Sequence, residues 1–358
     1  MTILGTRPEI IRLSRIIPLL DRLSQHVLVH TGQNFEPRLN NIFFDDLRLR
    51  LPDHSLSCIS GSAIDQIAAI LTVCGKVILK ENPDRLLILG DTNSALAAMA
   101  AKRMGIPVFH MEAGNRCYDD RVPEEVNRRI VDHCSDVLLP YTERSRANLL
   151  NEGIPGYRIF VTGNPILEVL EHYAEEVKAS QILETLGLEP QEYFLVTLHR
   201  AENVDIPTRL SRFIEALHLI NLEYEIPVIC SLHPRTRSQL DKSKQLLAGR
   251  GVRVIEPLGL FDFVQMEKQA CCVLSDSGTV QEECSIMGIP NVTLRDVTER
   301  PETVESGSSI ITGSDPEAIL QAVSAALRLG RDWDAPMEYT RKLVSPTIAK
   351  IILGALPG

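Results

Sequence analysis

RLLILGDTNSALAAMAAKRMGIPVFHME, residues 85–112, contains a complete strand–helix–strand pattern. The apolar runs at 86–89 and 108–111 are short and continuous, which is typical of parallel strands buried on both faces. The alanine-rich segment between them favours a helix, and Gly105 and Pro107 mark where that helix ends and the chain restarts. The stretch therefore predicts a parallel sheet covered by helices.

The same alternation extends in both directions from this stretch. Further apolar runs are TILG (2–5), HVLVHTG (26–32), DVLLPYT (136–142), YFLVTLH (193–199), PVICSLH (227–233), VRVIEPLG (252–259), CCVLSDSG (271–278) and PNVTLRD (290–296). We predict an α/β fold with two doubly wound, Rossmann-like domains at 1–170 and 171–340, and a last helix at 341–358 that packs back on the first domain. Two such domains facing each other form a cleft, because ligands bind beyond the carboxyl ends of parallel strands.

Composition excludes several classes of protein. The 358 residues carry a net charge of −10, which argues against an extended nucleic-acid surface. The eight cysteines form no C-x-x-C pair and lie mostly in apolar segments, so we expect reduced thiols in a cytoplasmic protein, with no disulfide framework and no metal site. We find neither a signal-peptide pattern nor an apolar stretch long enough to cross a membrane.

Charged and small residues follow the apolar runs at the edge where ligands are expected. Asp91 and Glu112 each come directly after a predicted strand, and Arg7 lies in the turn GTRPE. A single strand-end acid is often only a helix cap, but these turns recur along the chain. GTRPE is not the G-x-G-x-x-G of a dinucleotide site, so we expect no nicotinamide cofactor, whereas Arg7 can bind a phosphate.

The second half offers an anion site and two histidines. Ser277, Gly278 and Thr279 begin a predicted helix, where backbone N–H groups favour an anion, and Glu283 lies one turn further on, within reach of ribose hydroxyls. The alternatives are an ordinary N-cap and a solvated glutamate. His199 and His233 each end an apolar run; we expect acid–base or phosphate-binding roles, and hydrogen-bonded structural histidines are the alternative.

The segment PEEVNRRIVDH begins a helix at Pro123. Its apolar side chains share one face and its charged side chains share the opposite face: Val126, Ile130, Cys134 and Val137 against Glu124, Arg128 and Asp132. One interpretation is a solvated helix with internal ion pairs. The other directs the first turn of the helix into the same cleft as Asp91 and Glu112, where crowded carboxylates raise a pKa for acid–base chemistry.

Taken together, the motifs resemble those of the non-hydrolysing UDP-N-acetylglucosamine 2-epimerases. The motifs are GTRPE, HTGQN, GDT, HMEAG, PEEVNRRIVDH, VTGNP, LHRAEN, DSGTVQEE and RDVTERPETVESG, in the family's order from about residue 2 to residue 313. The resemblance implies a GT-B-like fold with its active site in the interdomain cleft, interconversion of UDP-GlcNAc and UDP-ManNAc, no cofactor, and a homodimer. It also implies elimination of UDP to 2-acetamidoglucal followed by re-addition.

The resemblance assigns roles to individual positions. Asp91, Glu112, Glu124 and His199 match its catalytic residues, and Arg12 stands where the family has a lysine. The residues matched to or predicted for UDP-sugar binding are Arg7, Arg128, His233, Ser277, Gly278, Thr279, Glu283 and Arg300. In HRAEN, Ala201 replaces a charged residue, and HTGQNFEPRLN lacks part of the pattern that resembles an allosteric site.

Four alternatives remain open from the sequence. The motifs GTRPEIIRLS and EAGNRCYDDRVPEE also resemble epimerases of other UDP-2-acetamido sugars, such as those that form UDP-N-acetyl-L-fucosamine. A hydrolysing epimerase would release UDP. A retaining glycosyltransferase would need an acceptor site, and a UDP-sugar sensor would bind its ligand without exchanging the C-2 hydrogen.

Overall fold

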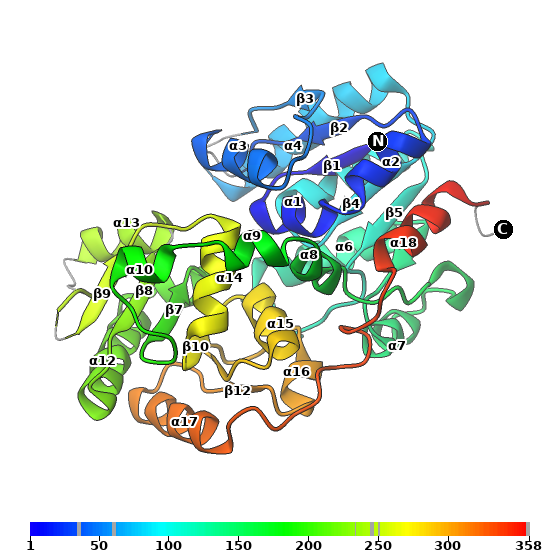
Figure 1. Cartoon of the computed structure of the whole chain (residues 1–358). Helices are drawn as coiled ribbons and strands as arrows, with labels where there is room; N and C mark the ends of the chain where they lie inside the picture. The colour runs from blue at the N-terminus through cyan, green and yellow to red at the C-terminus, as the bar shows by residue number, and fades with distance from the viewer. Residues whose placement is uncertain (34–36, 59–61, 233, 244–246, 250, 356–358) are drawn as a thin grey trace. The chain divides into compact units, whose positions relative to one another are not determined.

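The computed structural model describes residues 1–33, 37–58, 62–232, 234–243, 247–249 and 251–355. The chain divides into two compact units. The first unit comprises 1–171 together with 338–358, and the second comprises 172–337. Each unit contains its own six-stranded sheet (Figure 1).

The first unit alternates short strands with helices. Its strands are β1 (Thr2–Leu4), β2 (Leu28–His30), β3 (His54–Ser55), β4 (Leu86–Leu89), β5 (Val108–Met111) and β6 (Val137–Leu139). Its helices are α1 (Arg7–Leu13), α2 (Ile17–Leu23), α3 (Pro37–Asp46), α4 (Ala63–Glu81), η1 (Asn93–Leu96), α5 (Ala97–Arg103), α6 (Pro123–Cys134), α7 (Glu143–Asn151), η2 (Gly156–Arg158), α8 (Ile166–His172, at the unit boundary) and α18 (Val344–Leu353). The strands are parallel, in the order β3-β2-β1-β4-β5-β6.

The second unit repeats this plan. Its strands are β7 (Phe194–Leu198), β8 (Val228–Leu232), β9 (Val252–Ile255), β10 (Cys272–Ser275), β11 (Asn291–Thr293) and β12 (Ser309–Ile311). Its helices are α9 (Ala174–Lys178), α10 (Ile182–Leu186), α11 (Ala201–Val204), α12 (Pro207–Tyr224), α13 (Pro234–Ser243), α14 (Leu260–Gln269), α15 (Gly278–Met287), α16 (Pro301–Glu305) and α17 (Pro316–Leu329). The strands are again parallel, in the order β12-β11-β10-β7-β8-β9.

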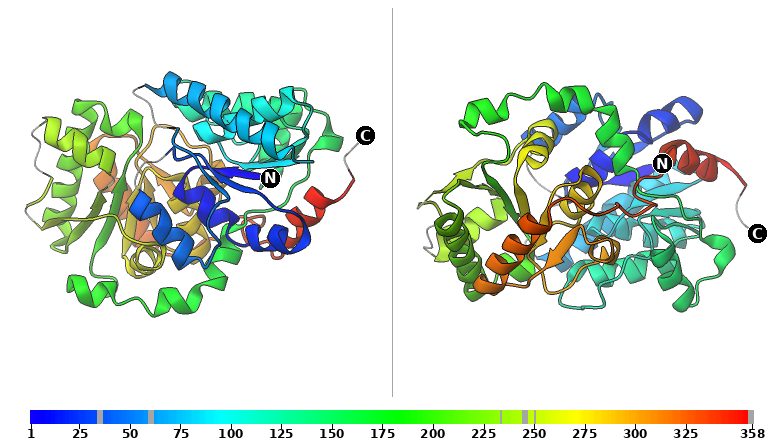
Figure 2. Two further views of the ribbon diagram at one scale, coloured as in Figure 1. Left: turned by 90° about the horizontal axis from the view of Figure 1, so that it is seen from above. Right: turned by 60° about the horizontal axis from the view of Figure 1, so that its bottom comes forward.

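Both sheets have the strand order of doubly wound nucleotide-binding folds. Counted from its own first strand, each unit reads 3-2-1-4-5-6, and the order reverses between β1 and β4 and between β7 and β10. Helices cover both faces of each sheet (Figure 2), with separate apolar cores on the two faces of the second sheet. Ligands bind beyond the carboxyl ends of the strands at such reversals. The predicted fold of two doubly wound units is confirmed.

The end of the chain belongs to the first unit. Helix α18 contacts α2 and buries Val344, Ile348 and Ile352 (Figure 1, red). The Arg85 guanidinium donates a hydrogen bond to the carbonyl of Ile352.

Two strands and one helix differ from the sequence predictions. The strands β3 and β12 were not predicted, because two or three residues give too short an apolar pattern to recognise. The solvated interpretation of α6 is wrong: Arg128 and Asp132 on its charged face are only 2% and 0% exposed, whereas Val126 and Ile130 are 44% and 36% exposed. The reason is that the charged face pairs with residues of the sheet edge.

The described residues contain no disulfide, no metal-binding cluster and no membrane-spanning helix. All eight cysteines are free thiols. In the described ranges, no cluster of three or more histidine, cysteine or acidic side chains is arranged to hold a metal ion. None of the helices resolved in those ranges is both long and apolar enough to span a membrane.

Candidate active site

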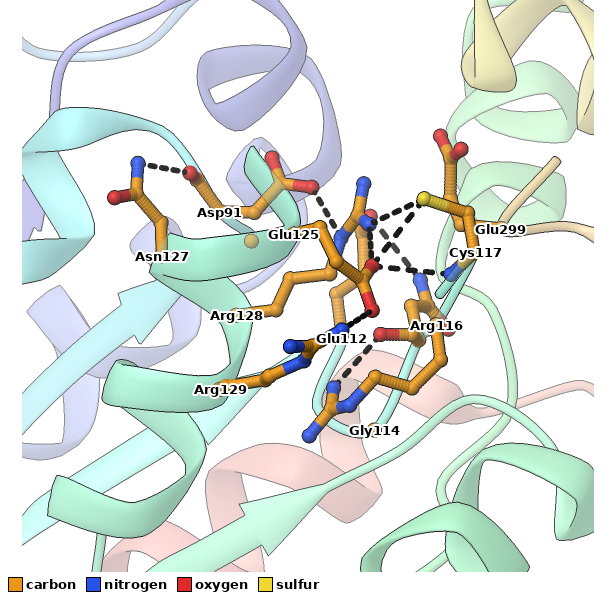
Figure 3. A network of polar contacts seen from close by, with 12 residues as sticks. Asp91, Glu112, Gly114, Arg116, Cys117, Glu125, Asn127, Arg128, Arg129 and Glu299 are labelled. Atoms are coloured by element: carbon orange, nitrogen blue, oxygen red, sulfur yellow. Dashed lines mark hydrogen bonds and ion pairs between the residues drawn. The ribbon is translucent and has the colours of Figure 1, made fainter. Parts of the chain in front are cut away.

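Helix α6 holds Asp91 at the carboxyl end of β4. The Arg128 Nε donates to Asp91 Oδ2 at 2.8 Å, and the Asn127 amide donates to the Asp91 carbonyl at 2.9 Å (Figure 3). The Asp91 side chain remains 20% exposed, whereas that of Arg128 is 2% exposed. The carboxylate of Asp91 is therefore fixed by a buried cation and still accessible from solvent.

Glu112 follows β5 in a strained turn. Its φ angle is 64°, in the left-handed region that side chains other than glycine rarely adopt. The Arg12 guanidinium forms an ion pair with Glu112 Oε2, and Asn115 donates to Oε1 at 3.4 Å. Gly114 ends the turn at φ 79°, and a Cβ there would lie 2.3 Å from the carbonyl oxygen of Ser145. The turn thus depends on glycine at 114 and directs Glu112 onto Arg12.

Glu125 organises the loop between β5 and α6, a role that the sequence did not reveal. It is fully buried and accepts hydrogen bonds from the backbone N–H groups of Cys117 and Tyr118, at 3.0 and 3.2 Å. Its carboxylate also pairs with Arg128 (Figure 3). Burial alone raises the pKa of Glu125, but these hydrogen bonds and the Arg128 charge outweigh burial and hold it below its usual range. The preceding residue, Glu124, is half-buried in the first turn of α6.

The GTRPE turn contains a buried acid, Glu9, in addition to Arg7, the residue predicted to bind a phosphate. Glu9 accepts hydrogen bonds from the N–H groups of Gly5 and Thr6 and, at 2.6 Å, from the Thr92 hydroxyl. Burial, with a smaller effect of Asp91, raises its pKa to about 7. Arg7 is half-buried, with its guanidinium carbon 5.7 Å from the centre of the Phe43 ring.

In the second unit, Asp276 positions His199. Asp276 is fully buried after β10 and accepts hydrogen bonds from the N–H groups of His199 and Arg200 and from the Asn203 amide. The His199 Nδ1 lies 3.1 Å from Asp276 Oδ1, and the imidazole is 38% exposed. Burial raises the pKa of Asp276, but the His199 charge and these donors outweigh burial and lower it to about 2.

Helix α15 begins directly after Asp276 with an amino end suited to an anion. Ser277 is its N-cap residue, but the Ser277 side chain makes no capping hydrogen bond. The first turn therefore presents the N–H groups of Gly278 and Thr279 without a serine cap. Ser277 therefore occupies the N-cap position without capping the helix through its side chain, unlike an ordinary serine N-cap.

Further along α15, buried acids have different partners. Glu282 forms an ion pair with the guanidinium of Arg300, which links Arg300 to α15. Glu283 lies against Glu267 of α14, and burial together with the charge of Glu283 raises the pKa of Glu267 well above its usual value. The two acids therefore lie together in a buried position that favours the protonated form of Glu267.

The structure brings several of the predicted residues into direct contact. In the first unit, Arg12 pairs with Glu112 and Arg128 pairs with Asp91. In the second unit, His199 contacts Asp276, which lies just before the amino end of α15. His233 lies outside the described residues. Sequence reasoning missed Glu9, Glu125 and Asp276, although each lies in or beside a motif that it had quoted.

Comparison with known proteins gives consistent results. A family model described as UDP-N-acetylglucosamine 2-epimerase matches residues 20–353. The UDP-N-acetylglucosamine 2-epimerase of Methanococcus maripaludis is 41% identical over 341 residues, which cover 93% of each chain. The UDP-2,3-diacetamido-2,3-dideoxy-D-glucuronate 2-epimerase of Pseudomonas aeruginosa is 36% identical, with 91% of this chain and 92% of that protein covered.

A solved structure gives the same result for the fold. The crystal structure of the Methanocaldococcus jannaschii UDP-GlcNAc 2-epimerase, in complex with UDP-GlcNAc and UDP, matches with a TM-score of 0.93. The two chains are 39% identical, and the match covers 98% of each.

Proposed function

The chain belongs to the UDP-N-acetylglucosamine 2-epimerase family, and we propose that it interconverts UDP-GlcNAc and UDP-ManNAc without net hydrolysis. The observation that carries this proposal is the pair Asp91 and Glu112. They follow β4 and β5, which are adjacent parallel strands, and each carboxylate is paired with its own buried arginine. Epimerisation at one carbon needs a group that removes a proton and another that returns it.

The proposed reaction starts at C-1 of the sugar. The C-1–O bond breaks and UDP departs with the electron pair, which gives C-1 oxocarbenium character and acidifies the C-2 proton. A carboxylate of the first unit takes that proton, and the electrons of the C-2–H bond form the C-1–C-2 double bond of 2-acetamidoglucal. Return of a proton to the opposite face of C-2 and re-addition of UDP at C-1 complete the epimerisation.

Departure of UDP requires stabilisation of its developing negative charge. We assign this task to the second unit, where His199 and the N–H groups at the amino end of α15 lie on either side of the buried Asp276. Glu283 is assigned to the ribose; it lies against Glu267, whose pKa is raised by burial and by the charge of Glu283.

A second candidate substrate has a specific observation in its favour. The relative of 36% identity from Pseudomonas aeruginosa acts, by its name, on a UDP-2,3-diacetamido sugar acid. Its C-2 chemistry is the same, and only the substituents at C-3 and C-6 differ. The two candidates therefore share every residue assigned above and differ only in the groups that the protein must accept at C-3 and C-6 of the sugar.

Proton NMR in D₂O tests the proposal. Protein incubated with UDP-GlcNAc and no added cofactor should place deuterium at C-2 of both UDP-GlcNAc and newly formed UDP-ManNAc, with no free sugar. Accumulation of free N-acetylmannosamine and UDP would show a hydrolysing enzyme instead. Exchange confined to the UDP-2,3-diacetamido hexuronate would select the second candidate, and binding of UDP with no exchange in either sugar would contradict epimerisation.

The variant Glu112→Gln supplies the residue-level arm of this test. It retains the shape of the side chain but cannot accept a proton, so exchange should fall by at least about 10³-fold while UDP binding stays near that of the wild type. Glu143→Gln, at an exposed position on α7, is the matched control and should exchange normally. Full activity in Glu112→Gln would remove Glu112 from the mechanism.

A further inference from the structure

An ion-pair network, buried except for the partly exposed Glu152, lies beneath the turns that carry Asp91 and Glu112. His110 of β5 is 1% exposed, Asp132 of α6 is 0% exposed, and Arg116 follows the Glu112 turn at 4% exposed. None of these side chains was assigned a role from the sequence motifs, and buried charge of this kind is costly unless it is fully paired.

The hydrogen bonds of the network fix its protonation. The His110 Nδ1 lies 2.8 Å from Asp132 Oδ1, and its Nε2 lies 2.9 Å from the Gly90 carbonyl oxygen. A carbonyl oxygen only accepts hydrogen bonds, so Nε2 carries a proton. Asp132 also accepts from the Gly114 N–H, at 3.2 Å, and from the Arg116 guanidinium, at 2.8 Å. A carboxylate with these donors is ionised and accepts from Nδ1 as well.

The charges around the imidazole balance when it is a cation. Arg116 donates through Nε and Nη2 to both oxygens of Glu152, at 2.7 and 2.6 Å. The network then contains the two cations His110 and Arg116 and the two anions Asp132 and Glu152. Burial raises the pKa of Asp132, but the hydrogen bond from His110 and the Arg116 charge outweigh burial and hold that pKa below its usual range.

The network forms hydrogen bonds with backbone groups close in sequence to Asp91 and to Glu112. Gly90, whose carbonyl accepts from His110, directly precedes Asp91. Gly114, whose N–H donates to Asp132, ends the strained turn that begins at Glu112. A backbone in the left-handed region persists only where the surrounding contacts hold it there.

We propose that His110 is a doubly protonated imidazolium that, with Asp132, acts as a positioning residue for Asp91 and Glu112. From β5 it donates one hydrogen bond to the Gly90 carbonyl after β4 and one to Asp132 of α6, which in turn accepts from the Gly114 N–H. The ends of β4 and β5 are thereby held at a fixed separation. His110 does not contact substrate in this account. The inference rests on the proposed epimerase function for its catalytic consequence, but the protonation state of the imidazole is independent of any activity.

The kinetic test replaces His110 by glutamine. Glutamine has a single N–H₂ group, so it cannot donate to Asp132 and to the Gly90 carbonyl as the two ring nitrogens do. The matched control is His26→Gln. The His26 side chain is also buried, and its Nδ1 is paired with an aspartate, Asp21. Its Nε2, however, contacts the Thr2 hydroxyl at the amino end of β1, away from the carboxyl ends of the strands. We expect kcat to fall by about 10²-fold in His110→Gln, as for a misplaced catalytic group, with the KM for UDP-GlcNAc and the Kd for UDP within about twofold. His26→Gln should retain kcat at a similar loss of thermal stability. Equal kcat values in the two variants would overturn the positioning role.

The second measurement uses the wild-type protein, so that it holds even if His110→Gln does not fold. In ¹⁵N-histidine-labelled wild-type protein, one ring should show protons on both nitrogens at pH 7.5, and that ring is assigned to His110 through its correlation to the backbone resonances of the same residue. A His110 ring with one bare nitrogen would overturn the inference whatever the enzyme does. Absence of C-2 exchange in the wild type, with both ring protons present, would count against the proposed function alone.

Discussion

At the residue scale, the acids of the candidate active site are separated by cations. Asp91 and Glu112 do not pair with each other; each lies against an arginine, Arg128 or Arg12. Nearby, burial raises the pKa of the Glu9 carboxyl to about 7. The sequence indicated that crowded acids would raise a pKa, but it pointed to the strand-end carboxylates, because a pattern of residues does not show how deeply each side chain is buried.

The raised pKa of Glu9 makes the stability of the protein depend on pH. Glu9 titrates at about 7 in the folded protein, against 4.5 for an unperturbed glutamate. The folded state therefore favours the protonated acid: its contribution is complete below pH 4.5 and is lost as the pH rises to 7. Glu9→Gln mimics the protonated form and should become more stable relative to wild type by about 2–3 kcal/mol between pH 4.5 and pH 7.5.

Urea unfolding of Glu9→Gln and wild type at several pH values measures this difference. The exposed Glu143→Gln variant is the control and should differ from wild type by the same amount at every pH. A Glu9→Gln difference that is constant across the window would show that Glu9 has the same pKa in the folded and the unfolded protein.

At the scale of secondary structure, the sequence predicted where helices begin better than which face they bury. Pro123 does begin α6, but the expected apolar stripe is exposed at Val126 and Ile130, and Val137 lies in β6 beyond the helix. Periodicity assumes that apolar side chains are buried and charged ones solvated. In α6 the charged face is buried because Asn127, Arg128 and Asp132 have specific partners on the sheet edge. Those partners are distant in sequence, so no local pattern reveals them.

Helix α15 allows a test of anion binding by its amino end. A Cβ at Gly278 would lie 2.8 Å from Glu299 Oε1, so Gly278→Ala would displace either the Glu299 carboxylate or the first turn of the helix. We expect UDP to bind about tenfold more weakly, which corresponds to the 1–2 kcal/mol that a helix amino end contributes to anion binding. Isothermal titration with UDP gives this value directly.

The opposite end of the same helix provides the control. Gly288 has φ 69° at the C-cap, and a Cβ there meets nothing within 4 Å. Gly288→Ala should therefore lower stability through backbone strain, by about 1 kcal/mol, and leave the Kd for UDP unchanged. Equal loss of UDP affinity in both variants would mean that α15 acts through its stability and not through its amino end.

At the scale of the whole molecule, the order of elements along the chain was the most predictable property. Of the twelve strands in the described ranges, ten appear as apolar runs in the sequence, and their alternation with helices leads to two parallel sheets. The strand order within each sheet was not readable in the same way. It depends on contacts between segments that are far apart in the chain, such as β1 with β4 and β7 with β10.

Each unit has its own core, so we expect a defect in the first unit to leave the second folded. Removal of the chain from Val344 onward deletes the buried side chains of α18 in the first unit, of which Val344, Ile348 and Ile352 are the large apolar ones. This should destabilise that unit by about 5 kcal/mol. The single tryptophan, Trp333, reports on the second unit, where its Nε1 donates to the Ser285 carbonyl of α15 at 3.2 Å.

Thermal or urea unfolding followed by two signals tests this independence. Far-UV circular dichroism should show an early transition in the truncated chain, whereas Trp333 fluorescence should keep its wild-type midpoint. UDP at 100 times its Kd should raise the Trp333 midpoint in both proteins, by an amount equivalent to about 2.7 kcal/mol, because the proposed UDP ligands lie in the second unit. If truncation lowers both midpoints together, the two units unfold as one cooperative body, and the separate cores do not make them independent.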